Sequence, residues 1–476
     1  MDLMSNPDRL TGLDASFLAL EKDGAHMHVG SVLVFEGPAP DYDAFAARIA
    51  GGLHLVPRYR QRLAFPPLGA SRPVWVDDPH FNVGYHVRHT ALPAPAGEDE
   101  LRRLAGRVFS QQLDREKPLW EIWLVDELAG DRFALICKTH HALVDGISGV
   151  DIMTVLFDLD PDPPEGEPAP AWAARPFPGR AELLASAVGE RVAAPFGFVR
   201  GVLSAPDRAG VAAGRSVAGL AAMASAGIAG APPSPLNVRI GPHRRFAWAS
   251  SDLATFKAIK DALGGTINDV VLTVVAGALR AHLFRHGRDP EGLELKAMVP
   301  ISVRADADRG ALGNQVAAMY APLPVGLEDP VERFRFVHGA MKGLKESGQA
   351  VGAQAITRLA DAAAPTVLDQ AARLQSRQRF FNLTVTNVPG PQVPLYVLGR
   401  RLLAFYPKVP LVLNTALGIA IMSYDGHVFF GLLGDYDALA DIDALAADLD
   451  AAITELAEIA GAPVKRARSR RAPVRA

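Results

Sequence analysis

The sequence predicts an α/β protein that consists of two domains. Its 476 residues exceed the roughly 250–300 residues at which a single hydrophobic core stops growing, so more than one core is expected. Short apolar segments typical of strands alternate with helical patterns in both halves of the chain. A proline-rich segment separates the two halves.

The first domain is predicted to span residues 1–160. Residues 27–35 are apolar and rich in β-branched side chains, which favours a strand, and the apolar spacing of residues 42–53 favours a helix. Residues 132–138 form a continuous apolar run of the kind found in buried strands. A helical pattern covers residues 149–159, so strand and helix alternate again.

A linker at residues 161–235 and a second domain at residues 236–461 follow. Seven prolines lie between positions 161 and 178, and the later part of the linker has helical patterns rich in Ala and Gly. The second domain is predicted to contain a helix after position 268 and a helix from position 441. Its strands are expected at residues 295–303 and 381–386, with a final pair around residues 419–432.

Composition limits the classes of function. Hydrophobic residues make up 49% and charged residues 21%, as in a well-packed globular protein. The net charge of -3 gives no field that would favour nucleic acid, so no nucleic-acid partner is expected. Cys137, the single cysteine, cannot form an internal disulfide and is expected to be a small apolar strand residue. No signal peptide or transmembrane segment is recognisable, so a cytoplasmic location is expected.

The pattern HHxxxDG, formed by His140, His141, Asp145 and Gly146, follows the buried strand at residues 132–138. Successive strand side chains point to opposite faces, so one histidine is expected to act chemically and the other to pack. A neutral imidazole can take a proton from an attacking hydroxyl. Asp145 could orient the imidazole or pair with an arginine, and spacing does not decide between these roles. A metal site of two histidines and a carboxylate is disfavoured because adjacent strand histidines diverge.

Two other chemistries are not supported by motifs. The segment nearest to a G-x-S-x-G nucleophile elbow, at residues 146–149, lacks the closing glycine at position 150. Neither a G-x-x-x-x-G-K-[ST] phosphate loop nor a G-x-G-x-x-G after a strand is found. No metal and no prosthetic group are therefore expected.

Several short motifs occur in the order typical of one family. They are LDASFL at 13–18, MHVG at 27–30, PLW at 118–120, HHxxxDG, TINDVVL at 266–272, PISVR at 300–304, LGNQ at 312–315, TNVPGP at 386–391 and SYDG at 423–426. HHxxxDG resembles the active-site motif of the CoA-dependent acyltransferase superfamily. The whole series resembles bacterial wax ester synthase/diacylglycerol acyltransferases and extends from residue 13 to about residue 440.

The resemblance implies two chloramphenicol-acetyltransferase-like α/β sandwich domains with the active-site channel between them. By position His141 would be the general base, and Asp145 would be mainly structural, with Arg304 as one candidate partner. Asn268 matches a residue that the family places near the reaction centre, where its amide could donate to the oxyanion or hold the histidine. A helix N-cap before Asp269 is an equally natural role for Asn268.

The implied activity is transfer of a fatty acyl group from acyl-CoA to diacylglycerol, which makes triacylglycerol. A long-chain fatty alcohol is the alternative acceptor and would give a wax ester. A catalytically silent protein that binds lipid or acyl-CoA is a further alternative. Acyl-CoA would be a co-substrate, and no cofactor is implied. A peptide-forming condensation domain is disfavoured because it would need carrier-protein neighbours, so no carrier protein is expected.

Two segments are candidates for contact with lipid. Leu184, Val188 and Val192 recur at a spacing of four residues, and this face would lie either on a lipid surface or on the protein itself. The basic tail at residues 462–476 is expected to be disordered, with contact to anionic headgroups as the alternative. Peripheral association with a membrane or lipid droplet would suit a water-insoluble acceptor.

Overall fold

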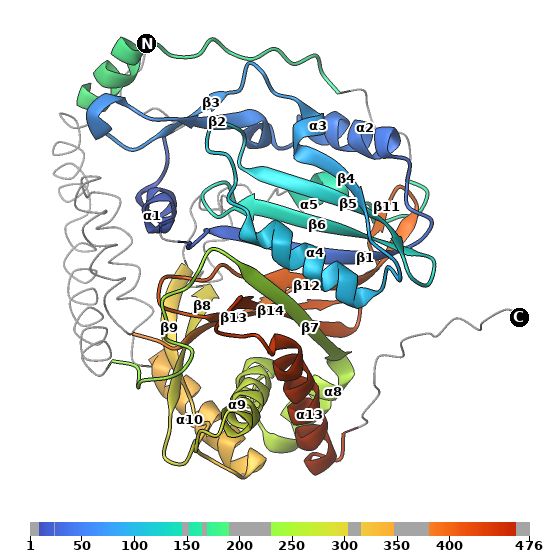
Figure 1. Ribbon diagram of the computed structural model, residues 1–476, viewed down its shortest axis with the longest axis vertical. Helices are drawn as coiled ribbons and strands as arrows, with labels where there is room; N and C mark the ends of the chain where they lie inside the picture. Colours follow the sequence, from blue (N-terminus) through green and yellow to red (C-terminus); the bar gives the residue numbers. More distant parts are fainter. Residues whose placement is uncertain are drawn as a thin grey trace, which may run out of the picture.

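Two six-stranded sheets, one in each half of the molecule, form its centre, and helices pack around them (Figure 1). The computed structural model describes residues 9–22, 24–144, 152–163, 169–189, 230–302, 316–346 and 380–462. The buried apolar side chains of these residues form two large clusters, one for each half of the molecule. The predicted α/β class with two cores is confirmed.

The first sheet is mainly antiparallel and contains strands from both halves of the chain. In spatial order its strands are β11 (Tyr396–Val397), β12 (Arg400–Lys408), β1 (His28–Glu36), β6 (Arg132–His140), β5 (Trp120–Leu128) and β4 (Val87–Ala91). Its helices are α1 (Gly12–Leu20), α2 (Tyr42–Gly52), α3 (Val83–His86), α4 (Glu98–Ser110) and α5 (Ile152–Leu156). A small sheet of β2 (Gln61–Ala64) and β3 (Val74–Asp77) lies beside it.

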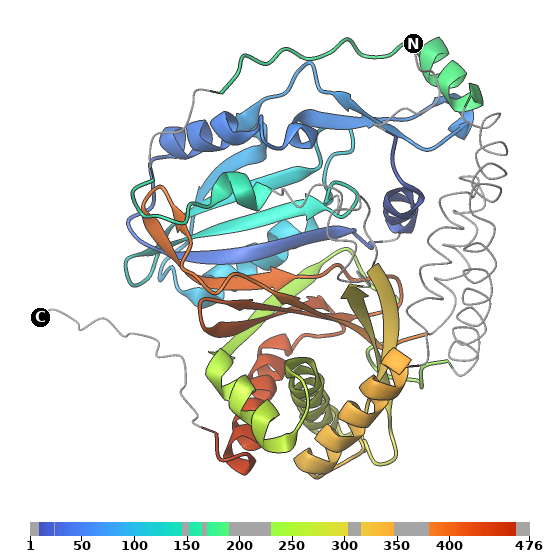
Figure 2. The same cartoon turned by 180° about the vertical axis from the view of Figure 1, so that it is seen from behind.

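The second sheet is mixed parallel and antiparallel. In spatial order its strands are β7 (Arg244–Asp252), β14 (His427–Asp435), β13 (Leu417–Tyr424), β10 (Leu383–Pro389), β8 (Leu295–Ser302) and β9 (Val316–Leu323). The outer face is covered by α8 (Leu253–Leu263), α9 (Ile267–Arg285), α10 (Pro330–Glu346) and α13 (Ile442–Ile459), as both views show (Figures 1 and 2).

The register around β1 determines which side chains meet near the HHxxxDG segment. β1 pairs antiparallel with β6 on one side and with β12 on the other. His28 lies opposite His140, and Gly30 lies between Lys138 and Lys408. Because paired residues share a face of the sheet, the two histidines form one row and the two lysines form the next.

The two sheets come close where β12 crosses β14. A Cβ on Gly431 of β14 would lie 1.7 Å from the carbonyl oxygen of Pro407 in β12, so only glycine fits at this crossing. Nearby, Tyr406 of β12 stacks on Trp248 of β7, with ring centroids 4.7 Å apart. The halves are therefore in direct contact through backbone and aromatic side chains.

The observed elements differ from the predicted ones in two places. The helix predicted at residues 149–159 ends at Leu156, because Asp158 forms a bridge with Tyr396 of β11; residues 149–151 lie outside the described residues. Strands β11 and β12 fall within the predicted second domain, yet they complete the first sheet. β12 thereby covers the edge of β1 that would otherwise have unpaired backbone groups.

Within the described residues, α9 has the length and apolar composition of a membrane span, with a hydropathy of 1.4 over its most apolar window. However, 67% of that window is buried inside the protein. α9 packs against α13, α10 and α8, so in this structure it is a core helix of the second half.

In the described part of the linker, the residues that pack on the protein are not the expected ones. Residues 180–189 are helical, and Leu183 joins a small cluster with Ala64, Val74 and Val76 of the β2–β3 sheet. Leu184 and Val188 are 38% and 53% exposed. The expectation that their face could pack on the protein is therefore wrong for these two residues, because neighbouring positions turn inward instead. Val192, most of the linker and the tail from residue 463 lie outside the described residues.

Candidate active site

The segment that carries the paired histidines begins at the end of β6. The backbone N–H of His140 donates to the carbonyl of Leu119 (2.9 Å), and that of His141 donates to the carbonyl of Met27 (2.8 Å). The chain then turns, and Leu143 N–H donates back to the carbonyl of His140 (2.9 Å). Both histidines are thus fixed by backbone hydrogen bonds to neighbouring segments.

His141 is half-buried, and its ring stacks on Phe17 of α1 with centroids 3.9 Å apart. Its Nδ1 is buried without a hydrogen-bond partner, whereas the residue as a whole is only partly buried. Burial among the surrounding atoms lowers the pKa of His141 to about 4, so the ring is neutral at pH 7. A neutral imidazole at this position can accept a proton.

His140 has different surroundings, as the alternation of strand side chains predicts. It is 1% exposed, and its Nδ1 accepts from the backbone N–H of Ala142 (3.0 Å). Its Nε2 lies 3.7 Å from a carboxylate oxygen of Glu21, which is beyond hydrogen-bond distance but close enough for an ion pair. His140 therefore links the histidine turn to a buried carboxylate.

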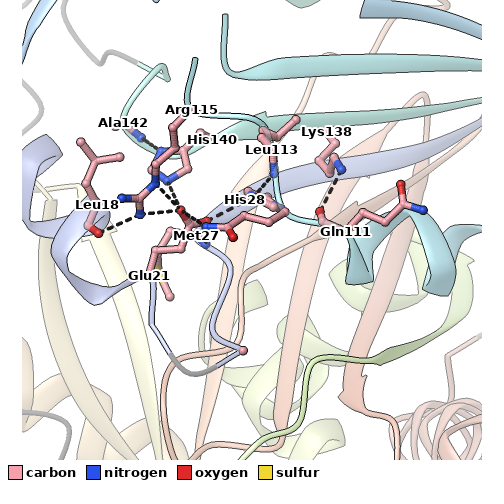
Figure 3. A network of polar contacts seen from close by, with 12 residues as sticks. Leu18, Glu21, Met27, His28, Gln111, Leu113, Arg115, Lys138, His140 and Ala142 are labelled. Carbon is pink, nitrogen blue, oxygen red and sulfur yellow. Dashed lines mark hydrogen bonds and ion pairs between the residues drawn. The ribbon is translucent and has the colours of Figure 1, made fainter. Parts of the chain in front are cut away.

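Glu21 is the centre of this network, which Figure 3 shows from close by. Its carboxylate accepts from Arg115 (2.8 and 3.2 Å), from Gln112 (3.0 Å) and from the backbone of Met27 (3.2 Å). Nε2 of His28 lies 3.3 Å from the other carboxylate oxygen. These groups connect the end of α1, the start of β1 and the segment after α4 to the histidine turn.

The charge of Glu21 is stabilised by its neighbours. Burial by itself raises the pKa of a carboxyl group, but the adjacent His140 and His28 hold the pKa of Glu21 well below its usual range. Arg115 supplies a permanent positive charge at 2.8 Å. Glu21 is therefore an ionised carboxylate with a full set of donors, although its side chain is only 1% exposed.

Two buried lysines lie one row further along the sheet. Lys138 donates to the carbonyls of Gln111 (3.0 Å) and Val108 (3.3 Å) at the C-terminus of α4, where a cation is favoured. Lys408 donates to the carbonyl of His28 and lies over the ring of Phe109. Burial lowers the pKa of both lysines, and that of Lys408 falls well below its usual value.

The remaining predicted site residues have mixed outcomes. Asp145 and Arg304 lie outside the described residues. Asn268 does not cap a helix: the N-cap of α9 is Thr266, whose hydroxyl accepts from Asp269 N–H (3.2 Å) while the Asp269 carboxylate accepts from Thr266 N–H (2.8 Å). The N-cap role expected for Asn268 is therefore wrong, because a capping box already occupies that position two residues earlier.

The sequence reading missed Glu21, His28 and Arg115. His28 lies in the motif MHVG, and a charged residue three positions after the segment LDASFL was a signal for Glu21. What joins them to His140 is the antiparallel register of β1 and β6, which no local pattern shows. Cys137, by contrast, is a buried residue of β6 that forms no disulfide, as expected.

Fold and site together define a class of protein. Two α/β halves and a half-buried neutral histidine after a central strand are the features of acyltransferases with the chloramphenicol-acetyltransferase type of fold. The first condensation domain of the calcium-dependent antibiotic synthetase matches with a TM-score of 0.58 over 97% of this chain and 98% of that chain. At 19% identity this likeness concerns the fold alone.

Sequence comparison identifies the family within this class. The wax ester synthase/diacylglycerol acyltransferase catalytic domain matches residues 10–271, and the C-terminal domain of the same family matches residues 312–457. A probable diacylglycerol O-acyltransferase of Mycobacterium tuberculosis is 33% identical over 464 residues, which cover 95% of this chain and 96% of the relative. The chain belongs to the wax ester synthase/diacylglycerol acyltransferase family.

A solved structure supports the same assignment. The wax ester synthase/diacylglycerol acyltransferase from Marinobacter aquaeolei VT8 has a TM-score of 0.68 and 29% identity to this chain. The match covers 95% of this chain and 99% of that chain. The predicted family and acyltransferase class are thus confirmed.

Proposed function

We propose that this acyltransferase moves a fatty acyl group from acyl-CoA to diacylglycerol, with His141 as the general base. The single observation that carries the proposal is the state of that side chain: half-buried, stacked on Phe17, and neutral at pH 7 because its pKa is lowered to about 4. Family membership supplies the reaction class, and the relative from Mycobacterium tuberculosis is named for diacylglycerol as acceptor.

The reaction proceeds by direct attack. The hydroxyl oxygen of diacylglycerol attacks the thioester carbon while its proton passes to Nε2 of His141, because Nδ1 is buried against the protein. The C–S bond then breaks, and the imidazolium returns the proton to the departing thiolate, which gives triacylglycerol and free CoA. The carboxamide of Asn268 donates to the oxyanion of the intermediate, and Asp145 is a structural residue that pairs with an arginine.

The test is release of free thiol from palmitoyl-CoA, with and without diacylglycerol. We expect His141→Gln to lower acceptor-dependent thiol release by about 10²–10⁴-fold, the usual contribution of a general base. His80→Gln, a change at an exposed histidine, is the matched control and should retain wild-type activity. Normal turnover by a folded His141→Gln protein would remove this residue from the mechanism.

A long-chain fatty alcohol is the second candidate acceptor and would give a wax ester. The solved structural relative from Marinobacter aquaeolei VT8 is named for both activities, which favours this alternative. Hexadecanol in place of diacylglycerol in the same assay separates the two acceptors. Binding of palmitoyl-CoA without thiol release for either acceptor would indicate a catalytically silent lipid-binding protein.

Contact with a lipid surface is part of the proposal. Leu68 is 100% exposed in the loop between β2 and β3, and Phe65 beside it is 53% exposed. Leu184 and Val188 are exposed on the helix that packs on the same small sheet. These four side chains, which we call the apolar tip, could enter the headgroup region of a membrane or lipid droplet. Sedimentation with phosphatidylcholine vesicles should fall when Phe65 and Leu68 are changed to Ser.

A further inference from the structure

A positively charged groove lies where the two halves meet, away from the histidine turn. It has a volume of about 850 Å³ and lies between α4 of the first half and the start of β7 and of α13 in the second. Its walls include five arginines and two aspartates; the arginines are Arg102, Arg103, Arg107, Arg244 and Arg245. The volume is typical of a small-ligand site, and the charge favours an anion.

Three of the arginines are already engaged with carboxylates. Arg244 lies 3.8 Å from Asp435, and the other two are Arg102 and Arg103. Arg102 lies 3.1 Å from Asp99 and 3.7 Å from Asp443, and its guanidinium lies over the ring of Trp248. Arg103 pairs with Glu100 at 2.9 Å. Arg102 offsets the charge of only one of its two aspartate partners, so one negative charge remains in the groove against the positive charges of Arg107 and Arg245.

Arg107 and Arg245 are the groups available to a ligand. Arg107 is exposed on α4, one turn beyond Arg103. Arg245 is held on the other wall, because its guanidinium lies 3.9 Å from the ring centroid of Tyr436 and its Nε donates to the Tyr436 carbonyl (2.9 Å). Among the described residues, neither has a carboxylate within ion-pair distance. Both therefore offer guanidinium N–H groups in a geometry that suits phosphate oxygens.

Arg244 forms the inner wall of the groove and connects it to the buried histidines. Its side chain is 2% exposed and donates to the backbone carbonyls of Gly241 (2.6 Å), His243 (2.7 Å) and Gly24. Burial lowers its pKa to about 10, so it remains charged at pH 7. Gly24 is two residues before His26, which Arg244 influences electrostatically.

A short series of ring contacts then leads to the reaction centre. The ring centroids of His26 and His28 are 5.5 Å apart, and those of His28 and His140 are 6.0 Å apart. His141 is the next residue along the chain. A series of neighbouring side chains thus links the groove to the proposed general base, and a ligand with a charged end and a distant reactive end would extend alongside this series.

We infer that this groove binds the phosphate groups of the co-substrate, and that the 3′-phosphorylated ADP end of acyl-CoA occupies it with Arg107 and Arg245 as phosphate ligands. The inference rests on the proposed function for the identity of the ligand. Guanidinium forks on two walls can hold separate phosphates at once, and the long phosphopantetheine arm carries the thioester from there towards His141. Arg102 and Arg244 position the walls and are not assigned to the ligand.

Direct binding tests the groove independently of turnover. The full chain and its Arg107→Ala, Arg245→Ala and double variants are titrated by calorimetry with adenosine 3′,5′-bisphosphate. We expect each single variant to raise Kd by about tenfold and the double variant by about 100-fold, as for loss of a charge-assisted hydrogen bond. Arg335→Ala, at an exposed position on α10, is the matched control and should bind as the wild type does. Unchanged affinity in the double variant would overturn the inference.

Kinetics with a truncated substrate give a second readout. The double variant should show a raised KM for palmitoyl-CoA with an unchanged kcat, whereas S-palmitoyl pantetheine, which lacks all the phosphates, should be used equally well by both proteins. Equal losses on both thioesters would contradict a phosphate site. Vesicles with phosphatidylglycerol provide the other phosphate source: if the double variant loses vesicle binding but not nucleotide binding, the groove takes lipid headgroups and the inference is wrong.

The same experiments separate this inference from the proposed function. If the wild type binds adenosine 3′,5′-bisphosphate through these arginines but releases no thiol, the phosphate site in the groove stands and the proposed function is wrong. If the wild type turns over palmitoyl-CoA and the double variant binds the nucleotide equally well, the proposed function stands and the phosphate site in the groove is wrong.

Discussion

At the residue scale, two adjacent histidines have separate environments because they leave a strand in opposite directions. His141 meets Phe17 and keeps part of its surface open, whereas His140 is buried next to Glu21. The carboxylate reaches His141 indirectly, because it accepts from the N–H of Met27, whose carbonyl accepts from the N–H of His141. Glu21 is therefore a positioning residue, and its charge is retained in the interior because Arg115 and neutral donors surround it.

Glu21→Gln should lower both stability and turnover. The change removes the negative charge but leaves the Arg115 charge half-buried, so we expect a loss of about 3 kcal/mol in the free energy of unfolding. Displacement of the histidine turn should lower kcat by about 10²-fold, with a smaller effect on KM. Urea denaturation and the thiol-release assay measure the two effects, and Glu294→Gln at an exposed position is the control. A Glu21→Gln protein as stable as the wild type would contradict the proposed contribution of the Glu21 charge to stability.

At the element scale, the start of α9 holds structural residues and a residue proposed for chemistry within one turn. Thr266 and Asp269 form the capping box, and Asp269 also lies 2.9 Å from Nδ1 of His338 on α10. Asn268 lies between them in the first turn, half-buried and free of any capping duty. The same short segment thus begins a core helix and presents one amide that the cap does not use.

Separate substitutions of Thr266 and Asn268 test these two roles. Thr266→Val removes the capping hydroxyl and should lower stability by about 1 kcal/mol, without a change in kcat. Asn268→Ala should change stability by less than about 0.5 kcal/mol. If its amide donates to the oxyanion, the same substitution should lower kcat by about 10²–10³-fold. The denaturant midpoints and the kcat values of both variants measure these effects. If Asn268→Ala destabilises the protein as much as Thr266→Val does, the role of Asn268 is structural.

The crossing of β12 and β14 gives a prediction about how the halves are joined. Gly431→Ala places a methyl group against the Pro407 carbonyl, so the two sheets must separate locally, and we expect a loss of at least about 3 kcal/mol. Gly339→Ala on α10 is the matched control, because nothing lies within 4 Å of its Cβ position. In a helix that change should stabilise by about 0.5–1 kcal/mol. Urea midpoints of the two variants should therefore move in opposite directions.

At the scale of the whole molecule, several histidines are buried in their neutral form. Burial is the main cause of the lowered pKa of His26, His86 and His141, each to about 4, and it also lowers that of His28 and His282. The unfolded chain, with ordinary histidine pKa values near 6.5, binds protons that the folded chain rejects. The histidine contribution to stability should therefore be complete above pH 6.5 and decline as the pH falls from 6.5 towards 4.

His86 isolates one such contribution. Its ring is 1% exposed, stacks on Trp120 and lies 2.8 Å from the Trp120 carbonyl. His86→Phe keeps a ring at this position but cannot titrate, so its loss of stability between pH 7.5 and pH 5 should be smaller than that of the wild type by about 2 kcal/mol. Urea denaturation at the two pH values measures the difference. The same pH dependence in His86→Phe and the wild type would contradict this contribution.

The amino-acid sequence by itself determined the α/β class, the strand before the paired histidines and the acyltransferase family. These features depend on local patterns: apolar runs, periodicity and short motifs in a fixed order. Only the tertiary structure decided that Glu21 and His28 lie beside His140, that β12 joins the first sheet, and that Thr266 rather than Asn268 caps α9. The physical reason is distance along the chain. Lys408 and His28 are 380 positions apart, and their contact depends on the pairing of β12 with β1 in the first sheet, which no local segment specifies.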